Sequence, residues 1–192
     1  MPLNSRGLGY WRLKLQGMGW LVFGRRQHAL ASFSEMLRLW PADAYALASR
    51  AHLLAQLGRR SEAIVDAIAL TRAHPERSAA DWFNLAFLLE ADARLDEAEA
   101  AFRRALAMDP KLDRAWYGLG LVLVRTQRLD DAVQALKRNT ELQPMSPYGW
   151  YQLARVHVDR HDPDAARQVI VHLKGFEPKV AAQLERETGL VG

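Results

Sequence analysis

Five prolines recur along the chain at a nearly constant interval. Pro41, Pro75, Pro110, Pro144 and Pro178 follow one another at spacings of 34, 35, 34 and 34 residues. Twelve residues before each proline lies an alanine, at Ala29, Ala63, Ala98, Ala132 and Ala166. Self-similarity at a fixed period of this length is the signature of a repeat architecture, in which each unit stacks on the next. The sequence therefore predicts five structural units in tandem.

Each unit has the hydrophobic pattern of a helical hairpin. Between residues 79 and 110, apolar residues fall at i, i+3, i+4 and i+7 in two runs that a polar break separates. The first run is Trp82, Leu85, Ala86 and Leu89, and the second contains Ala98, Phe102, Ala105 and Leu106. Two amphipathic helices in each unit predict an all-α fold.

Polar residues mark the predicted starts of these helices. Asp43, Ser78 and Ser146 precede the first helix of their units, and Pro147 follows at a favoured first-turn position. We expect four residues in the polar breaks to cap the second helices, namely Ser61, Asp96, Asp130 and Asp164.

These residues resemble a known family. The pattern W-x2-L-G/A, followed by A-x3-F and a closing proline, is similar to the tetratricopeptide repeat. The resemblance implies an all-α, right-handed solenoid of antiparallel helix pairs with about five units and a C-terminal capping helix. We place the units at 10–41 (divergent), 44–75, 79–110, 113–144 and 147–178, together a repeat domain over 10–178. Residues 1–9 are expected to be a flexible segment. Residues 179–192 are expected to form the capping helix and tail, with Val180 and Leu184 facing inward and Glu187 facing water.

Composition and charge exclude several classes of protein. The chain has no cysteine, which removes disulfides and thiolate chemistry. Its net charge of +4 arises from residues 1–34, which hold five cations and no acid, and an excess of this size does not predict a nucleic-acid partner. No apolar run is long enough to span a membrane, and the run at 18–23 precedes its arginines, the reverse of a secretory signal. We therefore expect a cytoplasmic protein.

Candidate catalytic groups are few. His157 and His161 are four residues apart on a predicted helix, but no third metal ligand accompanies them, and His157 occupies a core position of the repeat. Gly17 and Gly19, like Gly118 and Gly120, lie inside predicted helices, so we interpret them as packing glycines rather than a phosphate loop. The sequence predicts no enzymatic activity, no metal and no cofactor.

The resemblance implies a concave binding surface built from the first helix of each unit. The positions that the family uses for ligands correspond here to Tyr45, His52, Phe83, Asn84, Phe87, Arg114, Tyr117, Arg125, Tyr148, Tyr151 and Arg155. Tyrosine and arginine are frequent binding hot spots. Of the family's carboxylate clamp for chaperone tails, only Asn84 and Arg114 agree, so we do not predict that ligand. The expected ligand is an extended peptide or amphipathic helix, with acidic groups near the arginines.

The N-terminal helix is more apolar than a cap requires. Trp11, Trp20 and Phe23 are candidates for an oligomer or docking surface, and the helix is either a cap, a homodimer seam or a docking surface. We predict a non-catalytic protein-interaction module that serves as an adaptor, assembly factor or chaperone. Two alternatives stay open: a membrane-surface scaffold that uses the basic, apolar N-terminal helix, and an accessory subunit of a separate enzyme.

Overall fold

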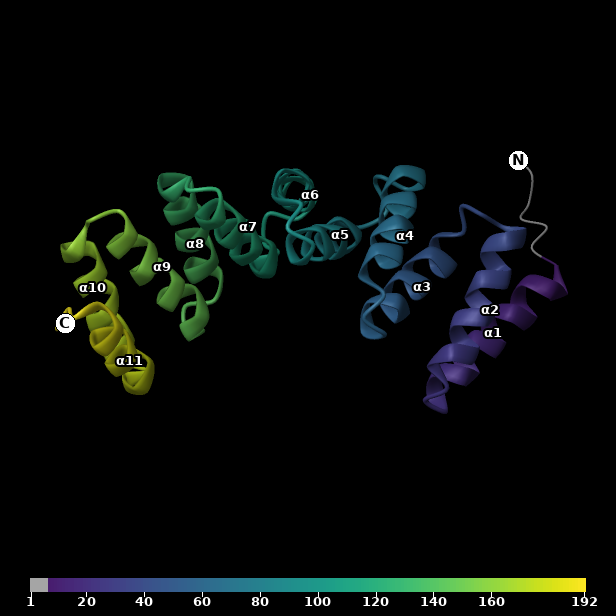
Figure 1. The fold of residues 1–192 in the computed structure, drawn as a ribbon, viewed down its shortest axis with the longest axis horizontal. Coiled ribbons are helices and arrows are strands. Elements are labelled where there is room, and N and C mark those ends of the chain that lie inside the picture. The colour runs from purple at the N-terminus through teal and green to yellow at the C-terminus, as the bar shows by residue number, and fades with distance from the viewer. Residues whose placement is uncertain (1–6) are drawn as a thin grey trace. The chain divides into compact units, whose positions relative to one another are not determined.

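The computed structural model describes residues 7–192, which contain eleven α-helices packed as sequential antiparallel pairs (Figure 1). The chain divides into two compact units, Met1–Ala93 and Arg94–Gly192. The first unit holds α1 (Leu8–Val22), α2 (Arg26–Leu39), α3 (Ala44–Gln56), α4 (Arg60–Ala73) and α5 (Ala79–Ala91). The second holds α6 (Leu95–Met108), α7 (Asp113–Arg125), α8 (Leu129–Leu142), α9 (Pro147–Asp159), α10 (Pro163–Lys174) and α11 (Pro178–Thr188). The predicted all-α solenoid is confirmed.

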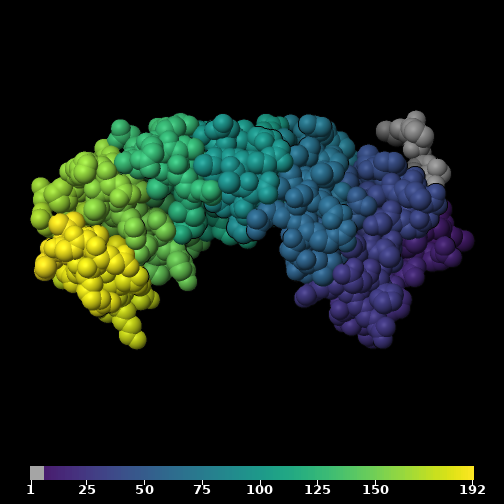
Figure 2. Space-filling view, viewed as in Figure 1, coloured from purple at the N-terminus to yellow at the C-terminus, as the bar shows by residue number. Residues whose placement is uncertain are grey.

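The predicted segments and the observed helices do not share all their boundaries. Residues 1–6 of the expected flexible segment lie outside the described residues, and α1 already begins at Leu8. The helices of the predicted unit 79–110, α5 and α6, fall in different compact units. In the second unit, α11 packs against α10 (yellow on light green in Figure 2) and buries Ala181 and Leu184, while Val180 is half-buried.

Small residues lie where two helices approach most closely. The five repeating alanines, Ala29, Ala63, Ala98, Ala132 and Ala166, are all fully buried. A Cβ at Gly17 would come within 2.7 Å of the Phe33 ring, and one at Gly120 within 2.7 Å of Leu136. The Phe102 ring likewise leaves no room for a Cβ at Gly118. These three glycines therefore have the predicted packing role.

Gly19 does not pack, which corrects the prediction for this residue. A Cβ there would meet nothing within 4 Å. Residues two positions apart point about 200° away from each other around a helix. On α7 this places Gly118 against α6 and Gly120 against α8, whereas on α1 Gly17 lies against α2 and Gly19 points to a side where no atom is close enough to meet a Cβ.

The second helices begin earlier than predicted. Asp43 and Ser78 accept hydrogen bonds from Ala46 and Ala80 N–H groups as expected, and Ser146 occupies an N-cap without a side-chain bond. The cap assignments of Ser61, Asp96, Asp130 and Asp164 are wrong, because these residues lie inside the first turn. The N-cap residues are Arg59, Arg94, Arg128 and Asp162. Each of these arginines pairs instead with the acid three residues on, Glu62, Glu97 or Asp131.

The turn inside each hairpin requires a left-handed residue just before this N-cap. Glycine supplies it at Gly24 and Gly58, but Ala93, Gln127 and His161 adopt φ values of 60°, 61° and 59° in the later hairpins. An L-residue with a Cβ is disfavoured in this region by roughly 1–2 kcal/mol. The later turns therefore carry a local conformational cost that the glycine turns do not.

Tryptophan side chains link successive repeats. The indole N–H of Trp82 donates to the Pro75 carbonyl at 2.8 Å. Trp116 and Trp150 donate in the same way to Pro110 and Pro144, each at 2.9 Å. In each case a tryptophan of one repeat bonds to the closing proline of the repeat before it. The bond fixes the start of the first helix in the later repeat.

Candidate functional site

The eleven predicted binding residues all lie on the first helices of the pairs, and none of them is buried. In the first unit, α3 carries Tyr45 and His52, and α5 carries Phe83, Asn84 and Phe87. In the second unit, α7 carries Arg114, Tyr117 and Arg125, and α9 carries Tyr148, Tyr151 and Arg155. Seven of the eleven are exposed, and Tyr45, Phe83, Tyr117 and Tyr151 are half-buried.

In the first unit the binding face is aromatic. The rings of Phe83 and Phe87 stack with centroids 6.5 Å apart, and Phe87 is 58% exposed. The ammonium of Lys14, from α1, lies 4.1 Å from the centre of the Tyr45 ring, a cation–π arrangement. This face offers flat apolar surface with one cation beside it.

In the second unit a carboxylate of the chain itself lies on the predicted binding residues. The Tyr151 hydroxyl donates to Glu187 Oε2 at 2.6 Å, and Arg155 Nη1 lies 3.3 Å from the same oxygen. Gln183 donates to Oε1 at 2.7 Å. The hydroxyl of Tyr151, then the amide of Gln183, lower the pKa of Glu187. Glu187 is exposed, as expected, and because α11 also folds back against α9 its carboxylate reaches Tyr151 and Arg155.

Tyr117 and Tyr148 belong to a separate depression in the second unit. They line a pocket of about 340 Å³ together with Arg114, Asn139 and Gln143. Tyr148 is 72% exposed at its edge. Sequence reasoning missed Asn139, whose amide donates to the Asp113 carbonyl at 2.9 Å, because it belongs to a second helix.

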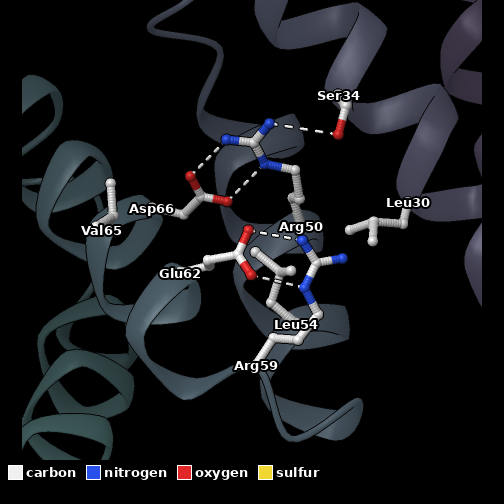
Figure 3. Close-up of a pocket in the computed structure, with 8 residues that line it drawn as sticks. All are labelled: Leu30, Ser34, Arg50, Leu54, Arg59, Glu62, Val65 and Asp66. Atoms are coloured by element: carbon white, nitrogen blue, oxygen red, sulfur yellow. Dashed lines mark hydrogen bonds and ion pairs between the residues drawn. The ribbon is translucent and has the colours of Figure 1, made fainter.

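A pocket of about 190 Å³ between α2, α3 and α4 is closed by ion pairs (Figure 3). Arg50 donates to both carboxylate oxygens of Asp66 at 2.7 Å, and its third nitrogen lies 3.4 Å from the Ser34 hydroxyl. Arg59 pairs with Glu62 in the same pocket. The ion pairs Arg50–Asp66 and Arg59–Glu62 stabilise the hairpin of α3 and α4. Because these arginines and carboxylates bond to one another, the pocket offers a ligand no unpaired charge.

The two histidines do not form a pair. His157 is 5% exposed, as predicted for a core residue, and its Nδ1 lies 3.6 Å from Asp162 Oδ2 without a hydrogen bond. Burial lowers the pKa of His157, and the Asp162 charge opposes that effect. His161 lies beyond the end of α9, in the left-handed turn. Among residues 7–192, no group of three potential ligands could hold a metal ion.

The candidate N-terminal docking residues divide between two environments. Trp11 and Phe23 are largely exposed, at 52% and 77%. Trp20 is half-buried, with its ring 4.9 Å from that of His28. In the part of the chain that the structure describes, no helix is long and apolar enough to cross a membrane.

Comparison with known proteins places the chain among repeat proteins. A family model described as tetratricopeptide repeat matches residues 50–113 and 83–147, which together exceed half of the chain. No curated protein sequence matches.

Solved structures with this fold share little sequence with the chain. MamA from Desulfovibrio magneticus RS-1 is 20% identical, with 95% of this chain and 98% of that one covered and a TM-score of 0.80. A tetratricopeptide repeat protein from Parabacteroides merdae is 19% identical, with coverages of 95% and 75% and a TM-score of 0.82. YrrB, described as a TPR protein with an unusual peptide-binding site, is 17% identical, with 88% of each chain covered and a TM-score of 0.80. At these identities the structures support the fold alone. With the period, the helix pairs and the family match in agreement, the chain belongs to the tetratricopeptide repeat family.

Proposed function

We propose that this protein is a non-catalytic interaction module that binds an extended peptide or amphipathic helix of a partner on its first-helix surfaces. It acts in the cytoplasm as an adaptor, assembly factor or chaperone. Tetratricopeptide repeat proteins generally mediate protein–protein interactions, and membership of the family supports that general role.

The observation that carries the proposal is that none of the eleven predicted residues on the first helices is buried and that seven of them are exposed. Aromatic rings and arginines make up most of this set, and both are enriched at binding hot spots. The peptide-binding site in the description of YrrB, which has the same fold, is consistent with such a use.

The chemistry of α9 supports an acidic ligand. Tyr151 and Arg155 already hold one carboxylate, that of Glu187, at hydrogen-bonding distance. A carboxylate from a partner would find the same donors by displacing Glu187. The first unit, with Phe83 and Phe87, suits apolar side chains of the ligand.

The test is peptide selection followed by measured affinities. Peptides that bind the full chain are selected from a random library, and their Kd values are measured for Phe87→Ala and Tyr148→Ala. Val65→Ala and Val171→Ala are matched controls, because these residues are 65% and 55% exposed on second helices. We expect Phe87→Ala or Tyr148→Ala to weaken binding by about tenfold, roughly 1.4 kcal/mol, and the controls to leave it unchanged. Equal effects from both sets, with native circular dichroism throughout, would show that the binding face is elsewhere.

A further inference from the structure

Helix α1 has two apolar faces, and only one of them is packed. Tyr10, Leu13 and Gly17 are buried on the side toward α2. On another side, five exposed residues follow one another at intervals of three, four, three and four: Leu8, Trp11, Leu15, Met18 and Val22. Their exposed fractions run from 43% at Met18 to 92% at Leu8. We call these five residues the α1 seam.

The spacing of the α1 seam indicates the kind of structure that fits it. Apolar residues at alternating intervals of three and four form the a and d positions of a heptad repeat, the narrow seam of a coiled coil. Leu21, which is 38% exposed, lies beside the seam at a g position, one heptad after Lys14. A helix that inserts in a bilayer or a core carries a wider apolar face. The seam extends over the whole of α1, so a partner helix of similar length would contact all five residues.

Charge selects among helical partners. Residues 7–34 contain Arg12, Lys14, Arg25 and Arg26 and no acidic residue. Arg12 and Lys14 occupy the e and g positions on either side of the α1 seam, where coiled coils place the charges that set partner choice. A second copy of α1 would bring Arg12 and Lys14 from each chain together with no acid on either helix to offset them.

Other described helices of this chain do not offer a matching seam. The exposed large apolar residues outside α1 and its C-cap are isolated, one to a helix or loop: Leu39, Val65, Phe87, Met145, Tyr148, Val171 and Val191. The complementary surface therefore has to come from another molecule.

We propose that the α1 seam docks an amphipathic helix of a partner protein whose apolar a and d residues are flanked by Glu or Asp. The partner's apolar residues cover Trp11, Leu15 and Met18, and its carboxylates face Arg12 and Lys14. The five seam residues are not among the predicted binding residues on α3, α5, α7 and α9, although Lys14 lies beside both sets, 4.1 Å from the centre of the Tyr45 ring.

The experiment uses the full chain and two designed probes. Each probe is a fluorescent peptide of three heptads, about 21 residues, with Leu at a and d. The acidic probe has Glu at e and g, and the basic probe has Lys there. Leu15→Glu and Val22→Glu alter the seam, Arg12→Glu alters its charge, and Val65→Glu is the matched control on α4. Because all four side chains are exposed or on the surface, circular dichroism should stay native.

We expect the acidic probe to bind the wild-type chain at least about tenfold more tightly than the basic probe. Leu15→Glu, Val22→Glu and Arg12→Glu should each weaken it by a similar factor, while Val65→Glu and Phe87→Ala bind it like wild type. Equal binding of both probes, or acidic-probe binding that survives Leu15→Glu, would overturn the proposal. Two other results would overturn it as well. If the wild-type chain sediments as a dimer that Leu15→Glu abolishes, the occupant of the seam is a second copy of the chain. If the wild-type chain floats with phosphatidylglycerol vesicles and Leu15→Glu does not, the occupant is a bilayer. If Phe87→Ala and Tyr148→Ala abolish binding of the selected peptides, the acidic probe should still bind the α1 seam.

Discussion

The hydroxyl of Tyr151 on α9 donates to the carboxylate of Glu187 on α11 at 2.6 Å, and Arg155 lies 3.3 Å from the same oxygen. The bond joins residues 36 positions apart. It makes the last helix of the chain a neighbour of the predicted binding residues as well as a cover for the core.

Replacing Glu187 with Gln should loosen α11. The pKa of Glu187 is lowered in the folded protein, so its contribution to stability is present above the unfolded value of about 4.3 and is lost as pH falls through the lower, folded value. At pH 7 we expect amide exchange in 178–188 to be at least about twofold faster in Glu187→Gln than in wild type. As pH falls below the folded pKa of Glu187, the two proteins should become alike. Glu141→Gln on α8 is the control. Identical exchange at pH 7 would mean that the hydrogen bond does not hold the helix.

Protonation of His157 should destabilise the fold. Burial lowers the pKa of this residue, so the unfolded state binds more protons than the native state just below the unfolded value of about 6.5. The contribution is therefore complete above that value and declines as pH falls toward the folded pKa. We expect the midpoint of urea unfolding to fall between pH 7.5 and 5.5 in wild type and to stay nearly constant in His157→Leu. A His157→Leu profile as steep as the wild-type one would assign the dependence to other groups.

The same substitution at two helical glycines should have opposite effects. In Gly118→Ala the new methyl group meets the Phe102 ring, and overpacking of this kind costs about 1–3 kcal/mol. In Gly19→Ala nothing lies within 4 Å, and the helix gains roughly 0.5–1 kcal/mol from the lower backbone entropy of the unfolded chain. Urea unfolding measures the change in the free energy of unfolding for both variants. Destabilisation by Gly19→Ala would mean that α1 is more closely covered than its contacts with α2 indicate.

Ala93→Gly should stabilise the protein despite the added chain entropy. Ala93 adopts a φ of 60°, which disfavours a residue with a Cβ by roughly 1–2 kcal/mol, against an entropy cost of up to about 1 kcal/mol for glycine. We expect a net gain of about 0.5 kcal/mol. Gly58→Ala, at the equivalent turn with a φ of 75°, should lose stability. Thermal unfolding of Ala93→Gly and Gly58→Ala measures these changes in stability. A lower stability in both variants would contradict the strain argument.

The features that repeat were predictable, and the features that depend on position in the array were not. The period identified the hairpins, the buried alanines and the three packing glycines, because these features recur at the same positions of the repeat. Gly19 was misjudged because a Cβ there meets nothing within 4 Å, which a repeat pattern does not show. Likewise, the Tyr151–Glu187 bond depends on how α11 turns back after Pro178, and no residue pattern encodes a contact that occurs once.

The caps failed for a different reason. Asp96 and Asp130 are good capping residues, but Ala93 and Gln127 adopt left-handed conformations, and the helices are capped two residues earlier, at Arg94 and Arg128. Such a conformation is evident from sequence when the residue is glycine, as at Gly58. It is hidden when the residue is alanine or glutamine.

The tryptophan–proline bonds have a consequence for how the chain folds. Each joins residues only six or seven positions apart, so the linkage between neighbouring repeats closes a very short loop and forms early. Leu47 stands where the second repeat would have a tryptophan, so the junction between the first and second repeats lacks this linkage. Folding should therefore nucleate in the C-terminal repeats and spread toward the N-terminus, and on unfolding the first hairpin, which carries the α1 seam, should be the first to come apart.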